Sequence, residues 1–73
     1  MVTQKQKETR EGVVIEAFPN TLFKVRFDPS GEELLTYLAG KMRLHRIRIL
    51  IGDRVTVELD GYQGSKGKII RRL

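Results

Sequence analysis

The stretch TLFKVRF, residues 21–27, carries the clearest strand signal in the chain. Its apolar side chains alternate with Lys24 and Arg26, which is the two-residue period of a strand with one buried face. Pro19-Asn20 precedes it and Asp28-Pro29-Ser30-Gly31 follows it, and both are turn sequences. Residues 9–18, before the first turn, are centred on β-branched side chains, so the two strands should form an antiparallel hairpin.

The rest of the chain supplies three more strands and one short helix. Residues 32–38 return from the second turn as a third strand. Residues 39–46 are good helix formers without β-branching, which predicts one or two helical turns. Residues 47–51 alternate in a short extended piece, residues 54–59 alternate cleanly as a fourth strand, and residues 67–73 form the last strand.

The order of these elements is strand, strand, strand, short helix, strand, strand. A helix between the third and fourth of five strands is the connectivity of the OB-fold, a small barrel. Closure removes the strand edges that would otherwise be exposed in so short a chain. Gly12 and Gly67 lie inside strands, as expected at the sharp bends of a small barrel. The sequence therefore predicts an all-β, five-stranded OB-fold barrel with a short helix between strands 3 and 4.

Length and composition limit what can accompany this barrel. The chain has 73 residues, 40% of them hydrophobic, and no cysteine, which leaves room for one domain without disulfides. We predict a flexible N-terminal tail at residues 1–9 and the folded domain at residues 10–73. No apolar run approaches the roughly 20 residues of a membrane-spanning helix, and the polar N-terminus lacks a signal-peptide core. These features predict a cytoplasmic monomer with no membrane partner.

Positive charge is concentrated in two segments. The net charge is +5 and the pI is about 10.0. Residues 40–54 hold five cations against Asp53, and residues 65–73 hold four cations and no acid, so each segment carries +4. The remainder carries −3, the difference between +5 and twice +4. This segregation indicates one basic surface for an anionic partner rather than charges spread for solubility.

The sequence offers no pattern for catalysis or for metal binding. His45 is the single histidine, and arginines rather than a carboxylate surround it, so no catalytic triad can be built on it. Without cysteine, and with several carboxylates at turns, no set of metal ligands converges. Gly64-Ser65-Lys66-Gly67 lacks the spacing and the following helix of a phosphate-binding loop. We therefore predict no enzyme activity, no cofactor and no metal.

The basic segments and the aromatic residues favour RNA as the anionic partner. Small barrels bind single strands and irregular RNA with a basic face and a few aromatic platforms, and phosphate neutralisation supplies much of the affinity. Phe18, Phe23 and Phe27 are expected in the core. Tyr62, in a polar and glycine-rich loop, is the best candidate for base stacking. We therefore predict that the domain at residues 10–73 binds RNA.

Three blocks of sequence resemble those of a known family. The first is FPNTLFKV at residues 18–25, and the second is GKMR, followed by IRIL and GDRVTVEL, at residues 40–59. Tyr62 and SKGKI at residues 65–69 continue the match. Over residues 10–72 the chain resembles bacterial and organellar translation initiation factor one, an OB-fold family of the S1-like type.

The resemblance implies a role on the small ribosomal subunit. A member of this family would bind the A site of the 30S subunit, contact 16S rRNA and a neighbouring small-subunit protein, block premature tRNA entry, and assist initiation factors two and three. Carried over position by position, the residues expected to face the RNA are Lys41, Met42, Arg43, Arg48, Tyr62, Lys66, Lys68 and Arg71. Composition alone leaves Met42 equally suited to packing against the barrel, so its role rests on the resemblance.

Arg46 departs from the family pattern, because a tyrosine usually stands there. A guanidinium can stack on bases and bind phosphate, so we include Arg46 in the predicted RNA-binding set. Two alternatives stay open. One is a general single-stranded RNA-binding protein or RNA chaperone of cold-shock type, which would bind random RNA as tightly as small subunits. The other is a barrel that binds only protein, whose partner binding would be insensitive to salt.

Overall fold

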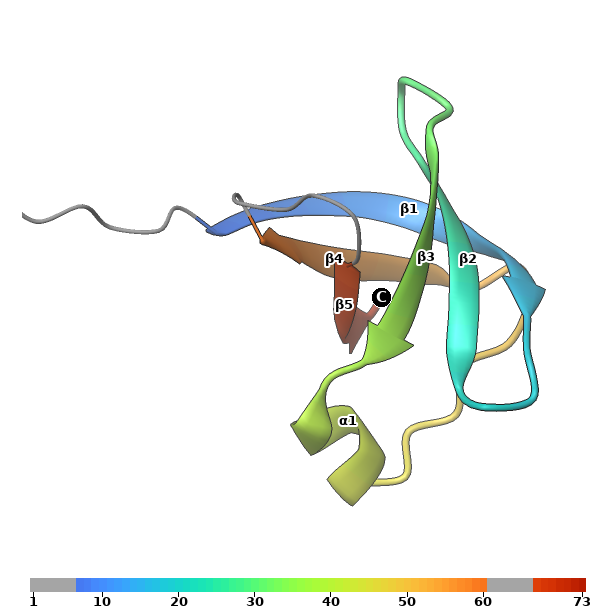
Figure 1. The fold of residues 1–73 in the computed structure, drawn as a ribbon, viewed down its shortest axis with the longest axis vertical. Helices are drawn as coiled ribbons and strands as arrows, with labels where there is room; N and C mark the ends of the chain where they lie inside the picture. The colour runs from blue at the N-terminus through green and yellow to red at the C-terminus, as the bar shows by residue number, and fades with distance from the viewer. Residues whose placement is uncertain (1–6, 61–66) are drawn as a thin grey trace, which may run out of the picture.

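The computed structural model describes residues 7–60 and 67–73 of the chain, and these form a closed five-stranded barrel (Figure 1). The elements are β1 (Lys7–Ala17), β2 (Leu22–Phe27), β3 (Glu33–Leu38), α1 (Gly40–Leu44), β4 (Arg54–Asp60) and β5 (Gly67–Arg72). The barrel order is β1-β2-β3-β5-β4, with β4 returning to β1. The predicted OB-fold barrel, with its short helix between strands 3 and 4, is confirmed.

The long first strand closes the barrel. β1 pairs with β4 through its first half and with β2 through its second, and the two ladders meet at Gly12 and Val13. A Cβ atom on Gly12 would lie 2.4 Å from the Arg26 carbonyl oxygen and 2.7 Å from Val25 Cγ1. Only glycine fits where the backbones approach so closely, which explains why a glycine stands inside this strand.

The core follows the alternation that the sequence predicts. On β2, Phe23, Val25 and Phe27 are all buried. The remaining buried apolar residues come from the other strands, the helix and its flanking segments: Val14, Leu38, Ala39, Met42, Ile49, Val55, Val57 and Ile69. Thr36 is the buried polar residue of the described chain, and its Oγ1 donates a hydrogen bond of 2.8 Å to the Phe23 carbonyl, so its hydroxyl is satisfied.

Two local expectations differ from the structure. Residues 7–9, placed in the tail by the sequence, belong to β1 and pair with β4. Phe18 is half-buried after the end of β1 rather than part of the core. Residues 47–51, predicted as a short extended piece and not counted among the five strands, lie outside every strand of the described chain. In this segment Ile49 is buried, whereas Ile51 is 64% exposed.

Candidate nucleic-acid interface

The short helix α1 places cations on the surface and one apolar side chain inside. Met42 is buried in the core cluster, while Lys41 and Arg43 on either side of it are exposed. The helix follows β3 and lies at the end of the barrel opposite the β2–β3 turn (Figure 1). Met42 therefore anchors the helix to the barrel, and the cations beside it remain available to a ligand.

The end of α1 turns the chain back toward the barrel. The Ile47 amide donates to the Met42 carbonyl and the Arg46 amide donates to the Arg43 carbonyl, each at 3.0 Å. These two bonds are the Schellman pattern that ends many helices, and it requires a left-handed residue at the position of Arg46. Arg46 has φ 55°. The turn brings residues 45–48 alongside β5, where they form one wall of a groove.

A bulge in β5 builds the second wall. Val57 pairs with Ile69 and Thr56 pairs with Arg71, so Ile70 is an extra residue in the ladder. Successive side chains of a regular strand point to opposite faces, and a bulge changes that direction locally. As a result, the consecutive residues Ile70 and Arg71 both line the groove.

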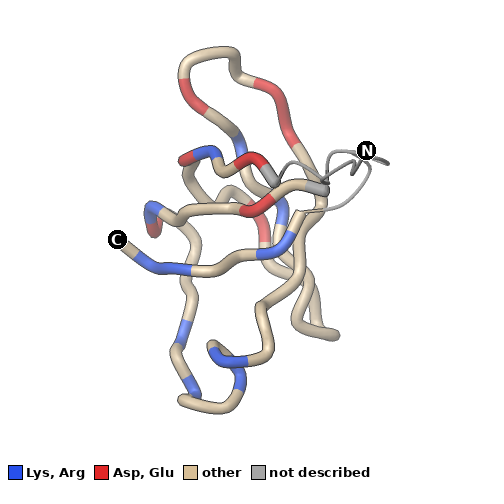
Figure 2. The backbone as a smooth tube through the Cα atoms, turned by 90° about the vertical axis from the view of Figure 1, so that its left-hand side faces the viewer, with Lys and Arg blue, Asp and Glu red and all other residues tan. Residues whose placement is uncertain are grey.

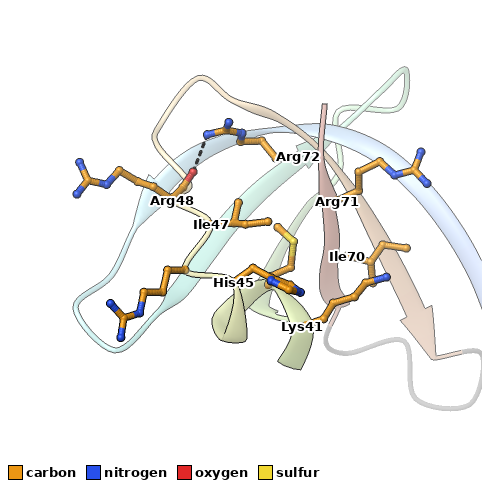
Figure 3. A pocket seen from close by; sticks show the side chains of 9 residues that line it. Lys41, His45, Ile47, Arg48, Ile70, Arg71 and Arg72 are labelled. Carbon is orange, nitrogen blue, oxygen red and sulfur yellow. Dashed lines mark hydrogen bonds between the residues drawn. The ribbon is translucent and has the colours of Figure 1, made fainter.

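The groove between these walls has a volume of about 580 Å³. Its lining residues are Lys41, Met42, His45, Arg46, Ile47, Arg48, Ile70, Arg71 and Arg72. Ile47 and Arg48 lie on one side, with Ile70 and Arg71 on the other (Figure 3). Arg72 Nη1 donates a hydrogen bond of 2.9 Å to the Arg48 carbonyl, which ties the two walls together (Figure 3).

The cations of the groove have no counter-charge within the described residues. Five ion pairs form in the described chain: Arg10–Glu32, Lys24–Glu16, Arg26–Glu33, Arg54–Asp28 and Lys68–Glu58. None of them includes a residue that lines the groove, and no acidic residue belongs to the lining. Figure 2 shows the same separation, with only Lys and Arg marked on the helix and on the first part of the connection that follows it. A cationic concavity of this kind attracts anions.

Arg54 illustrates the contrasting, paired environment. Its guanidinium donates to the Asp28 carboxylate, and this hydrogen bond together with the negative charge of Asp28 raises the pKa of Arg54. Arg54 stays protonated throughout the neutral range in any case. Asp28 therefore neutralises the charge of Arg54 within the protein, although Arg54 was counted among the cations of the basic segment at residues 40–54.

The structure gathers five of the predicted site residues into the groove. Lys41, Arg46, Arg48 and Arg71 line it from α1, the helix end and β5. Met42 also contributes to the lining, but it is only 3% exposed, so it forms the base of the groove rather than a projecting contact.

The other predicted residues lie elsewhere. Arg43 is exposed on α1 without lining the groove. Lys68 is half-buried, and its Nζ lies 3.4 Å from Glu58 Oε1, so part of its charge is neutralised within the protein. Tyr62 and Lys66, which include the predicted base-stacking residue, lie outside the described residues.

Four lining residues are absent from the predicted contacts: His45, Ile47, Ile70 and Arg72. The sequence raises His45 only as a catalytic candidate, and Ile70 only as part of a strand. Arg72 counts toward the basic C-terminal segment, which is the signal that could have found it. The bulge that aims Ile70 and Arg71 together has no signature in the sequence.

A small closed barrel with a concave, uncompensated cationic surface is typical of OB-fold nucleic-acid-binding proteins. The chain belongs to the family described as translation initiation factor 1A / IF-1, whose model matches residues 1–73. Its members are described as translation initiation factors. The family is one of translation factors rather than of enzymes.

Individual relatives agree with this assignment. Over 72 residues the chain is 46% identical to "Translation initiation factor IF-1, chloroplastic" from Solanum lycopersicum. The match covers 99% of this chain and 46% of that protein, so the chain spans about half the length of the curated relative. The solution structure of translation initiation factor one from the Wolbachia endosymbiont strain TRS of Brugia malayi is 42% identical, with a TM-score of 0.79 over 92% of this chain and 78% of that one.

Two further solved structures share the barrel. YjeQ from Thermotoga maritima is 35% identical, with a TM-score of 0.73 over 90% of this chain and 23% of that one. Eukaryotic translation initiation factor 5A from Methanococcus jannaschii is 15% identical, with a TM-score of 0.64 over 92% and 44% of the two chains, a likeness of fold alone. Among the described residues, no helix is long and apolar enough to cross a membrane.

Proposed function

We propose that the protein is a translation initiation factor that binds the A site of the small ribosomal subunit through its cationic groove. There it blocks premature entry of tRNA and assists initiation factors two and three. The observation that carries this proposal is the groove itself, which is lined by five Lys and Arg side chains and by no acid of the described chain. Family membership supplies the ribosomal context.

The chemistry of the groove suits irregular RNA better than a regular duplex. Arginine presents several donors in one plane and can hold a phosphate with two hydrogen bonds. The apolar side chains of Ile47 and Ile70 line the groove together with the cations. They can cover the face of an unpaired base, whereas a stacked duplex hides its base faces. The mechanism we propose combines phosphate binding, reshaping of flexible rRNA bases, and steric exclusion of tRNA.

The partners and the compartment belong to the same proposal. The contacts we propose are 16S rRNA and a neighbouring small-subunit protein, made by a monomer. The cytoplasmic location predicted from the sequence widens here, because the tomato relative is named as chloroplastic. We propose that the protein acts where 30S-type subunits are found, whether in a bacterial cytoplasm or in a plastid stroma.

The general RNA-binding alternative has lost support. A cold-shock type of protein needs several aromatic side chains exposed on strand faces; β3 offers Tyr37, which is 37% exposed, and β2 carries the other two aromatic residues of the described strands. Phe23 is 8% exposed and Phe27 is 2% exposed, so neither offers its ring to a base. The exposed surface of β2 therefore provides no stacking platform.

Competition on purified small subunits tests the proposal. The protein should bind subunits and reduce the occupancy of tRNA in the A site, and a chemical footprint should show protection of A-site bases of 16S rRNA. Two observations would overturn the proposal: unimpeded A-site tRNA binding at saturating protein, or equal affinity for subunits and for random single-stranded RNA. A variant with Lys24→Ala and Arg26→Ala is the matched control, because it removes two cations outside the groove.

A further inference from the structure

Arg46 occupies a backbone position that favours glycine. Its φ of 55° lies in the left-handed region, where a Cβ atom approaches the following carbonyl oxygen. The two hydrogen bonds of the helix end, Ile47 to Met42 and Arg46 to Arg43, fix this conformation. Glycine would close the same turn without strain. The chain therefore carries an arginine where the fold alone favours a smaller residue.

The described fold makes no use of the Arg46 side chain. It is exposed, and it forms no hydrogen bond or ion pair with another described residue. Thr21, the other described non-glycine residue with positive φ, differs in this respect, because its hydroxyl donates to the Asn20 carbonyl. Arg72 also differs, because its guanidinium holds the Arg48 carbonyl. Arg46 is thus strained without any compensating contact of its own, and it lines the groove.

We propose that Arg46 is a dedicated ligand-contact residue whose guanidinium binds RNA phosphate or stacks on a base, at the expense of the stability of the free protein. This inference rests on the proposed function of the groove. Backbone strain of this kind persists at binding sites when the surrounding structure enforces it. Here the helix-ending hydrogen bonds enforce the backbone, and the ligand supplies the partner that the side chain lacks.

Three substitutions at this position separate strain from charge. Arg46→Gly removes both, Arg46→Asn removes the charge and tolerates the left-handed backbone, and Arg46→Lys keeps the charge and the strain. Thermal unfolding gives stability, and titration of purified small subunits at several salt concentrations gives affinity. Thr21→Gly is the matched control, because it relieves the same kind of strain outside the groove.

Stability and affinity should change in opposite directions. Arg46→Gly should raise Tm by about 4 °C. It should also weaken subunit binding about tenfold and reduce the salt dependence by about one phosphate contact. Arg46→Asn should weaken binding to a similar degree, and Arg46→Lys should retain the salt dependence with an unchanged Tm. Thr21→Gly should leave binding unaltered.

The outcomes distinguish this inference from the function on which it rests. If the wild-type protein binds subunits and Arg46→Gly binds equally well, the inference is wrong and the proposed function stands. If Arg46→Gly lowers Tm, the side chain serves the fold, and the inference is again wrong. If the wild-type protein itself fails to bind subunits, the proposed function is overturned and the inference falls with it.

Discussion

The two ends of the barrel use arginine in opposite ways. At the end with the β2–β3 turn, Arg10, Arg26 and Arg54 each pair with an acid, and we call this the paired end. At the other end, the groove holds five Lys and Arg side chains with no acid among its lining residues. Figure 2 shows acidic positions around the β2–β3 turn and none around the helix.

The difference shows that pairing, rather than the number of cations, marks the binding surface. Arg10 donates to Glu32 at 2.9 Å and to Ser30 at 3.1 Å, and its guanidinium lies 4.6 Å from the centre of the Phe27 ring. These contacts satisfy the hydrogen-bond donors of the Arg10 guanidinium and balance its charge within the protein. In the groove, neighbouring cations repel one another in the free state, and an anionic ligand relieves that repulsion.

Removing three groove cations should have the largest effect on binding. A variant with Arg46→Ala, Arg48→Ala and Arg71→Ala should lose about 100-fold or more in affinity for small subunits, because each phosphate contact adds to affinity and to its salt dependence. Binding isotherms at several salt concentrations measure both quantities. The matched variant at the paired end carries Arg10→Ala, Arg26→Ala and Arg54→Ala. Equal losses of affinity in the two variants would show that the unpaired arginines of the groove and the paired arginines do not differ in their role in binding.

A substitution that destabilises the barrel should lower the free energy of unfolding of the whole domain, including both of its ends. Gly12→Ala places a Cβ against the backbone of Arg26, and overpacking of this kind destabilises by about 1–3 kcal/mol. Chemical denaturation measures the loss in the free energy of unfolding. Gly40→Ala is the control, because nothing lies within 4 Å of the added Cβ there. If Gly12→Ala left stability unchanged, the close approach of β1 and β2 would not constrain the fold.

The fold was predictable because its signals are local. The alternation of Phe23, Val25 and Phe27 identifies the buried face of β2, and turn residues mark its two ends. The segment at residues 47–51 shows what local alternation leaves open. Its isoleucines alternate like those of a strand, but the segment is not one of the five predicted strands, and no strand forms there. Ile49 is buried at the end of the barrel instead, which only the tertiary structure decides.

The site was predictable in its charge and less so in its geometry. Counting cations located both walls of the groove, since Lys41, Arg48 and Arg71 come from the two basic segments. Counting could not show that Arg54 differs from the groove cations. Arg54 pairs with Asp28, which is distant from it in the sequence. Nor could counting show that Met42 packs inward, because cations flank it on both sides. Pairing and burial are long-range properties that no short window of sequence contains.

Single substitutions on α1 should refine the boundary of the groove. Lys41 lines it and Arg43 does not, although both are exposed on the same short helix. Lys41→Ala should weaken subunit binding by about tenfold, and Arg43→Ala should weaken it less, because its charge acts from farther away. Neither should change the unfolding free energy by more than about 0.5 kcal/mol. Titrations and denaturation curves of the two variants provide the comparison, and a larger binding loss for Arg43→Ala would move the boundary.

The smallest effect should come from the ion pairs of the paired end. Arg10 and Glu32 hold side chains that are 26% and 68% exposed, so solvent and salt screen much of their attraction. A double-mutant cycle with Arg10→Ala and Glu32→Ala should give a coupling of about 0.5 kcal/mol in the free energy of unfolding, falling as salt rises. Subunit binding should be unaffected by either change, since this charge is already neutralised before the ligand arrives. A coupling above about 2 kcal/mol would mean that the pair supports the barrel itself, and the arginines of this end would then be structural elements rather than screened surface charges.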